Sequence, residues 1–190
     1  GMPKGYIFCG GAEKGELDGI YFTANMPTEE VFSCPDRNAV NGKIVAALPL
    51  CRNGQIIDKF WFEFNNGRIV DYGAEQGYGN LKTIIETDEG SHYLGEIALV
   101  GYNSPIRNLE TMFYETLFDE NASCHFAIGD CYPTCLQGGG NMSKEELAEH
   151  GLNSSLEHVD FMVGTNDLEI TATTECGNVL KIFENGEWVI

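Results

Sequence analysis

A hairpin signal limits the folds open to this chain more than any other feature. Over residues 55–64, large apolar side chains fall among polar ones, as in a strand with one buried face. These apolar residues are Ile57, Phe60, Phe62 and Phe64. The turn sequence Asn65-Asn66-Gly67 follows, and another apolar stretch covers 67–72. An Asn-Gly pair between apolar runs favours a tight turn, because both residues tolerate positive φ. The two stretches are therefore expected to pair as antiparallel strands.

The rest of the chain is also strand-rich. Runs dense in β-branched and apolar residues predict strands over 19–23, 43–50, 94–100, 124–128, 156–163, 167–173, 179–183 and 187–190. Helical spacing of apolar residues predicts helices over 78–88 and 109–117. A third helix should start after Ser143, which with Glu146 forms a capping box, and end at Gly151. The expected fold class is α+β, with mixed, largely antiparallel β-sheets and a few interspersed helices.

The length of 190 residues allows one sizeable core or two small lobes. The segment 137–141, Gln-Gly-Gly-Gly-Asn, is the clearest internal seam. We therefore expect a single domain over 1–190, with the alternative of two lobes joined near 137–141.

Charge and cysteine content narrow the function classes. The chain has 29 Asp and Glu against 11 Lys and Arg, a formal net charge of −18. Such a surface repels phosphate backbones and anionic lipids, which argues against nucleic-acid and membrane partners and favours cations. No apolar run approaches the roughly 20 residues of a membrane helix, and seven cysteines, an odd number, favour reduced thiols. A cytoplasmic location is the resulting expectation.

One short pattern, a histidine and an aspartate two residues apart, indicates a candidate metal site. His158 and Asp160 lie two residues apart in an expected strand, so both side chains project to one face. A second histidine, His125, lies in an earlier expected strand. Imidazole and carboxylate on one face suit a divalent metal site. The alternative is a hydrogen-bonded pair in which Asp160 only orients the His158 ring.

Longer blocks carry a family resemblance. They are Asn25-Met26-Pro27-Thr28-Glu29-Glu30-Val31-Phe32-Ser33, Glu89-Gly90, Leu94-Gly95-Glu96-Ile97-Ala98-Leu99-Val100, Thr116-Leu117-Phe118-Asp119-Glu120-Asn121-Ala122-Ser123-Cys124-His125 and His158-Val159-Asp160-Phe161-Met162. In residues and order they resemble the thermophilic-type metallo-aminopeptidases, the family of aminopeptidase T and aminopeptidase S. The match runs through nearly the whole chain.

The resemblance implies a dinuclear, metal-dependent aminopeptidase that hydrolyses the N-terminal peptide bond of peptides with a free N-terminus. The implied metal ligands are Glu30, Glu96, His125, Tyr132, His158 and Asp160. The two divalent ions are expected to be zinc or cobalt, with magnesium and manganese also compatible. The resemblance also implies a homodimer. Family members are about twice as long, so this chain is expected to be the C-terminal metal-binding part, without the family's N-terminal domain. The alternative function is a catalytically incompetent metal-binding or oligomerisation fragment.

Individual residues have further expected roles and alternatives. Glu96 lies within an apolar strand, where a carboxylate is costly to bury without a partner, and is the candidate bridging ligand. Glu29 is a candidate catalytic residue, as general base or as the group that binds the substrate amine, and Tyr132 is counted as catalytic as well as a ligand. Asp119 and Glu120 are candidates for orienting His125, or for a helix cap. Without metal, Glu30 would be a helix-start acid, His125 a core histidine and Tyr132 a packed tyrosine with its phenol in water.

Overall fold

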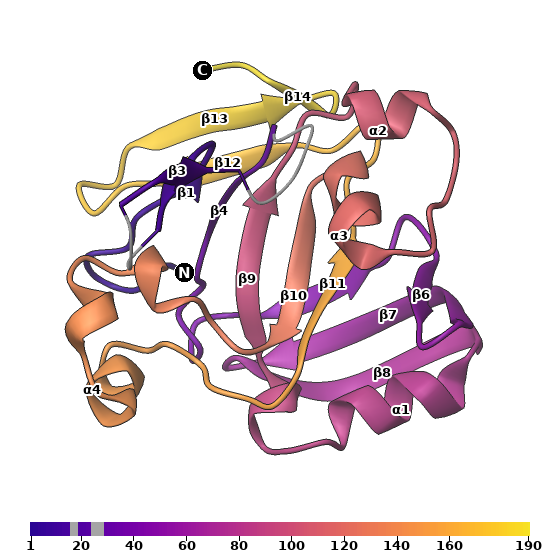
Figure 1. The fold of residues 1–190 in the computed structure, drawn as a ribbon, viewed down its shortest axis with the longest axis horizontal. Helices are drawn as coiled ribbons and strands as arrows, with labels where there is room; N and C mark the ends of the chain where they lie inside the picture. Colours follow the sequence, from indigo (N-terminus) through magenta and orange to yellow (C-terminus); the bar gives the residue numbers. More distant parts are fainter. Residues whose placement is uncertain (16–18, 24–28) are drawn as a thin grey trace.

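The computed structural model of the protein describes residues 1–15, 19–23 and 29–190 (Figure 1). Its largest sheet has five strands in the order β1-β4-β9-β10-β11, and each neighbouring pair is antiparallel. The bounds are β1 (Cys9–Gly10), β4 (Val31–Ser33), β9 (Leu94–Leu99), β10 (His125–Gly129) and β11 (His158–Met162). Strands far apart in sequence therefore meet side by side.

A second sheet contains the predicted hairpin, which is confirmed. Its strands are β5 (Gly42–Val45), β6 (Leu50–Arg52), β7 (Gln55–Asn65) and β8 (Arg68–Gln76). The tight turn between β7 and β8 has Asn66 at φ 47° and Gly67 at φ 83°. Both residues take the positive φ that an Asn-Gly turn favours.

The single strand expected over 43–50 is wrong, because the chain there makes two strands. β5 pairs with the end of β7 and β6 with its beginning, so the chain bends between them. Proline at position 49 cannot donate a ladder hydrogen bond and restricts the residue before it, which ends regular pairing. In the bend, Ala47 donates its N–H to the carbonyl oxygen of Met162 on β11 at 2.8 Å. The bend thereby joins the two sheets.

The main core lies where the two sheets face each other. Val159 and Phe161 of β11 pack against Phe60 and Phe62 of β7, and the ring centroids of Phe62 and Phe161 are 5.1 Å apart. The helix α1 (Tyr78–Ile85), which lies beside β8 in Figure 1, confirms the helix expected near 78–88. Its buried residues are Leu81, Ile84 and Ile85.

The remaining elements are short. Three helices are α2 (Pro105–Asn108), α3 (Thr116–Asp119) and α4 (Lys144–Glu149), with 3₁₀ turns η1 (Gly90–His92), η2 (Glu120–Ala122), η3 (Pro133–Cys135) and η4 (Gly139–Asn141). The pair β2 (Glu13–Lys14) and β3 (Tyr21–Phe22) forms one small sheet, and β12 (Ile170–Thr173), β13 (Val179–Glu184) and β14 (Glu187–Trp188) form another. The expected class, largely antiparallel sheets with few helices, is confirmed. No helix in the described ranges is long and apolar enough to span a membrane.

Local capping decides where the short helices form. The predicted capping box of Ser143 and Glu146 is present at the start of α4, as expected. The helix expected over 109–117 is wrong: Glu110 and Tyr114 have left-handed backbones, at φ 48° and 61°. Instead, the Asp119 carboxylate accepts the N–H groups of the residues at 113 and 115. A side chain thus takes the place of helical acceptors in this stretch.

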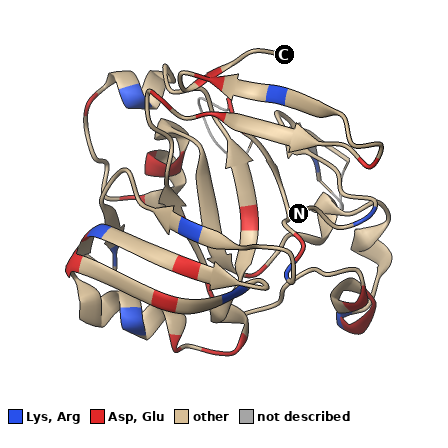
Figure 2. Ribbon diagram, turned by 180° about the vertical axis from the view of Figure 1, so that it is seen from behind, with Lys and Arg blue, Asp and Glu red and all other residues tan. Residues whose placement is uncertain are grey.

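The charge imbalance is visible over the whole molecule. Figure 2 shows Asp and Glu spread over many elements, with few Lys and Arg among them. All seven cysteines are free thiols.

Candidate metal centre

The candidate ligands gather on one face of the five-stranded sheet. Glu96 on β9 lies opposite Ala127 on β10, and Ala127 lies opposite Asp160 on β11. Opposite residues of antiparallel strands project to the same side, so only a methyl group separates the two carboxylates in this row. His125 and His158 are each two residues from a member of the row and share its face. The sheet therefore brings acids and imidazoles from three neighbouring strands together over a small side chain.

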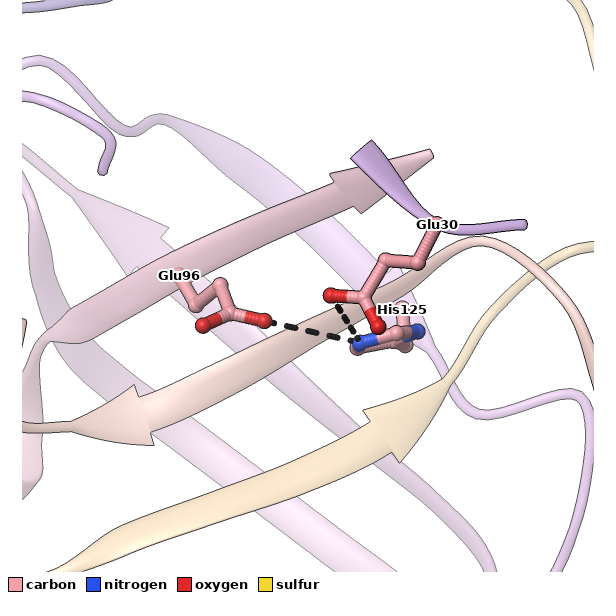
Figure 3. Close-up of side chains that lie close together, drawn as sticks. All are labelled: Glu30, Glu96 and His125. Carbon is pink, nitrogen blue, oxygen red and sulfur yellow. Dashed lines mark ion pairs between the residues drawn. The ribbon is translucent and has the colours of Figure 1, made fainter. Parts of the chain in front are cut away.

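The His125 ring lies close to the carboxylates of Glu30 and Glu96, as Figure 3 shows. Its side chain is buried, and its Nδ1–H donates to the carbonyl oxygen of Ser123 at 3.1 Å. Because a carbonyl oxygen only accepts, Nδ1 carries a proton, and in the neutral imidazole that a metal requires the lone pair is on Nε2. Nε2 lies 3.5 Å from Glu96 Oε1 and 3.6 Å from Glu30 Oε1. These atoms surround a common point without making a normal hydrogen bond.

His158 is oriented in the same way on the next strand. Its Nδ1–H donates to the carbonyl oxygen of Asp130 at 2.9 Å, which directs Nε2 to the opposite side. Nε2 lies 3.3 Å from Asp160 Oδ1 and 3.7 Å from Glu96 Oε2. The two oxygens of Glu96 therefore face different imidazoles, as the bridging role expected of it requires.

The electrostatics of the cluster favour cations. Burial alone would lower the pKa of His125, but the Glu30 and Glu96 carboxylates outweigh it and raise that pKa well above its ordinary value. Burial opposes the positive form of His158 too, yet Asp160 raises the pKa of His158 to about 9. Burial raises the pKa of Glu96, whereas for Asp160 the nearby His158 more than offsets burial and the pKa falls. Without a metal, protonated imidazoles supply the positive charge that this acidic site needs.

Unpartnered atoms show that divalent cations fit these residues. His125 Nε2 and Asp160 Oδ1 are buried and make no hydrogen bond of normal geometry within the described residues, although Asp160 Oδ1 lies 3.3 Å from His158 Nε2. Buried polar atoms are normally paired, because an unpaired one costs roughly 1–3 kcal/mol. Carboxylate oxygen and imidazole nitrogen are also the donors that zinc, cobalt and manganese accept. A cation among these atoms would satisfy both.

Three overlapping groups of ligand atoms, each within 4.8 Å of one another, define the centre. They are Glu30 with Glu96 and His125, Glu96 with His158 and Asp160, and Glu120 with His125 and Asp160. The sequence indicates for Glu120 only a role in orienting His125 or capping a helix, and the third group makes it a candidate ligand. The local signal is its place in η2, five residues before His125. Sequence alone does not show that η2 abuts β11.

Comparison with known proteins then decides the family. Residues 1–188 match the family model described as thermophilic metalloprotease (M29). This chain belongs to that family.

Relatives of the M29 chain agree with this assignment. Aminopeptidase AmpS of Bacillus subtilis is 50% identical over 98% of this chain and 45% of its own length. Aminopeptidase T of Thermus aquaticus is 40% identical over 100% of this chain and 46% of its own. The solved structure of wild-type AmpT from Thermus thermophilus superimposes with a TM-score of 0.92 at 37% identity, covering 100% of this chain and 46% of that one. The M29 chain thus spans about half the length of these relatives, and the resemblance read from its sequence is confirmed.

The last two site residues lie beside or near the cluster. The Tyr132 ring of the M29 chain packs against the His158 ring, with centroids 5.0 Å apart, and against Phe32 at 5.9 Å. Glu29 is exposed and precedes the buried Glu30, while the residues at 25–28 of the same block lie outside the described residues. The catalytic roles expected of Glu29 and Tyr132, and the metal ligation expected of Tyr132, stay predictions.

A cavity of about 370 Å³ adjoins the cluster in the M29 chain. Its lining includes Tyr102, Ile106, Arg107, Thr111, Ala122 and Met162. Met162 is two residues beyond Asp160 on β11, so it projects from the same face. The cavity therefore reaches the same face of β11 as the ligands, although none of the candidate ligands lines it.

Proposed function

We propose that the M29 chain holds the dinuclear metal centre of an aminopeptidase, which hydrolyses the N-terminal peptide bond of peptides. The observation that carries this proposal is the pair of ligand groups that share Glu96. One position would be held by Glu30, Glu96 and His125, the other by Glu96, His158 and Asp160. Glu120 adds a further oxygen near His125 and Asp160. Zinc or cobalt is the favoured metal, with magnesium or manganese compatible.

Charge balance supports two ions rather than one. Glu30, Glu96, Glu120 and Asp160 are all buried, and when ionised they carry a formal charge of about −4. Burying such a cluster without compensation is strongly unfavourable. Two divalent cations supply an equal positive charge and leave both imidazoles neutral.

The side chains around the ions divide the remaining work. Bound divalent ions supply Lewis acidity, which makes water a usable nucleophile and polarises the scissile carbonyl group. Glu29, exposed beside Glu30, would accept a proton or bind the α-ammonium group of the peptide. Tyr132, about half exposed at 49%, would donate its phenol O–H to the carbonyl oxygen of the substrate. The adjoining cavity would receive part of the peptide.

Metal analysis combined with hydrolysis tests this function. We expect the chain loaded with cobalt or zinc to retain about two ions after dialysis and to release the chromophore from aminoacyl-anilides. Chelation should abolish the hydrolysis, and metal should restore it. His158→Ala is expected to lose the activity, whereas Leu180→Ala, an exposed residue of β13, serves as the control. Undiminished hydrolysis by His158→Ala would contradict the proposal.

The chain spans less than half the length of these relatives, and this favours an alternative function without catalysis. Because it covers only 45–46% of their length, a substrate cleft that needs the rest of such a protein would be incomplete. The chain would then be a metal-binding or oligomer-forming module without turnover. Two tightly bound ions with no hydrolysis would support this second function. A homodimer and a cytoplasmic location belong to the main proposal, and the free thiols are compatible with the latter.

A further inference from the structure

The segment 129–132, which joins β10 to η3, shapes the His158 side of the centre. The carbonyl oxygen of Asp130 accepts the His158 Nδ1–H, and the Tyr132 ring packs on the His158 ring. His125, by contrast, is oriented by Ser123, before β10. The two imidazoles are therefore positioned by opposite ends of one strand.

Asn153 fixes this segment through hydrogen bonds. Its Nδ2 donates to the carbonyl oxygen of Gly129 at 2.6 Å and to that of Gly90 at 2.8 Å. Its backbone carbonyl accepts from Cys131 N at 3.2 Å, and its own N–H points to Cys131 Sγ at 3.3 Å. The residue is 3% exposed. These hydrogen bonds reach Gly129 and Cys131, the two residues that flank Asp130. They lie at the end of β10 opposite to Ser123, which orients His125.

The chemistry of these contacts requires an amide at position 153. Two carbonyl oxygens face one side-chain atom, so that atom must be the NH₂ group and not an oxygen. An aspartate in place of Asn153 would set a carboxylate against both carbonyl oxygens. The backbone is closely packed at this point, since a Cβ added at Gly129 would lie 2.0 Å from the carbonyl oxygen of Glu157.

We propose that Asn153 is a positioning residue for the metal position that contains His158. By fixing Gly129 and Cys131, it holds the Asp130 carbonyl oxygen where it keeps His158 Nε2 directed at Glu96 and Asp160. Because Cys131 directly precedes Tyr132, Asn153 also helps to hold the Tyr132 ring against the imidazole of His158. This inference rests on the proposed dinuclear centre and assigns a selective effect to a residue that touches neither ion.

The test compares the two metal positions within one molecule. Cobalt is titrated into the metal-free chain and followed by calorimetry and by the visible spectrum of the bound ion. We expect the unsubstituted chain to bind two ions, and Asn153→Ala and Asn153→Asp to keep one while binding the other about 10- to 100-fold more weakly, as is typical of outer-shell changes. Ile85→Ala, at the last residue of α1 and in the main core, is the control that lowers stability without touching the segment.

A second readout needs no metal. In nitrogen-edited NMR spectra of the metal-free chain, the Nδ1 proton of His158 should be held downfield by its bond to Asp130. It should broaden or disappear in both Asn153 variants, while the Nδ1 proton of His125 persists. Unchanged His158 signals and unchanged affinity for both ions would overturn the inference, as would an equal loss at both positions. Fewer than two ions in the unsubstituted chain would instead count against the dinuclear function and leave the NMR result to decide the positioning role.

Discussion

The two faces of strands β9, β10 and β11 have opposite characters. One face, here called the metal face, carries Glu96, His125, His158 and Asp160. The other, here called the core face, includes Ile128, Val159 and Phe161 and packs on the β7–β8 hairpin. The strands alternate between them residue by residue, so a shift of register by one position would exchange the two sets. Apolar burial on the core face thus fixes the register that assembles the metal face.

The two faces also differ in what satisfies them. The core face is complete in the protein alone, because its side chains contact other apolar side chains. The metal face leaves buried donor and acceptor atoms without partners among the described residues, on His125 and Asp160. We infer that the core face supplies folding stability and that the metal face uses part of it to hold charges close together. Substitutions should therefore separate stability from metal affinity.

The largest effect on stability should come from the core face. Phe161→Ala removes a fully buried ring that contacts three other phenylalanine rings. We expect a loss of about 3–5 kcal/mol in the free energy of unfolding, measured by urea denaturation in chelator. The fraction that stays folded should still bind metal in the original ratio. Loss of metal binding by molecules that are still folded would contradict the separation of stability from metal binding.

The metal face should show the reverse pattern. Glu96→Gln keeps the size of the side chain but removes the charge shared by both ligand groups. We expect metal affinity to fall by more than the roughly 100-fold typical of outer-shell changes, because this residue would touch the ions directly. In chelator, its unfolding free energy should change far less than that of Phe161→Ala. Wild-type affinity in isothermal titration would show that Glu96 is not a ligand.

A substitution outside both faces, at Asp88, should change the free energy of unfolding by an amount that depends on pH. The Asp88 carboxylate is bonded by Ser91, Ser155 and the N–H of Leu156, and although burial opposes its charge, these bonds lower the pKa of Asp88 to about 2. A carboxyl group with a lowered pKa stabilises the fold at neutral pH and loses this effect as the pH falls from about 4 to about 2. Asp88→Asn should therefore be less stable than the unsubstituted chain at pH 7, with the difference shrinking toward pH 2. Urea denaturation across this range measures it, and a constant difference would contradict the assignment.

The smallest effect is expected far from the metal centre. Ser143→Ala removes the side-chain half of the capping box of α4, which costs about 1 kcal/mol. The urea midpoint should fall accordingly, with metal affinity unchanged. A change in affinity here would mean that stability and metal binding are not separable in this molecule.

Sequence alone predicted the features that depend on neighbouring residues. The Asn66-Gly67 turn, the capping box at Ser143 and the face shared by His158 and Asp160 all follow from local geometry. The two wrong predictions, over 109–117 and 43–50, depend on contacts between residues far apart in the sequence. Asp119 captures backbone groups of the stretch expected to be helical, and the chain bends near residue 49 because its two halves pair with different parts of β7.

The candidate site was predictable for a different reason. The residue pattern identified the pair His158 and Asp160, joined by His125 from an earlier expected strand. Glu30, Glu96 and Tyr132 came from the family resemblance as ligands. Glu120 was not predicted as a ligand because its approach to Asp160 depends on how η2 packs against β11. Asn153 gave no signal either, since its amide acts on backbone carbonyl groups that any sequence would supply.

The most direct test of the metal face is anomalous X-ray diffraction from crystals of the chain grown with cobalt. We expect two strong anomalous peaks about 3.5–4 Å apart, the spacing usual for two-metal hydrolases, with Glu96 between them. His125 should bind one ion and His158 the other. Peaks remote from Glu96, or no ordered cobalt at saturating concentration, would contradict the claim that this face of the sheet is a dinuclear metal centre.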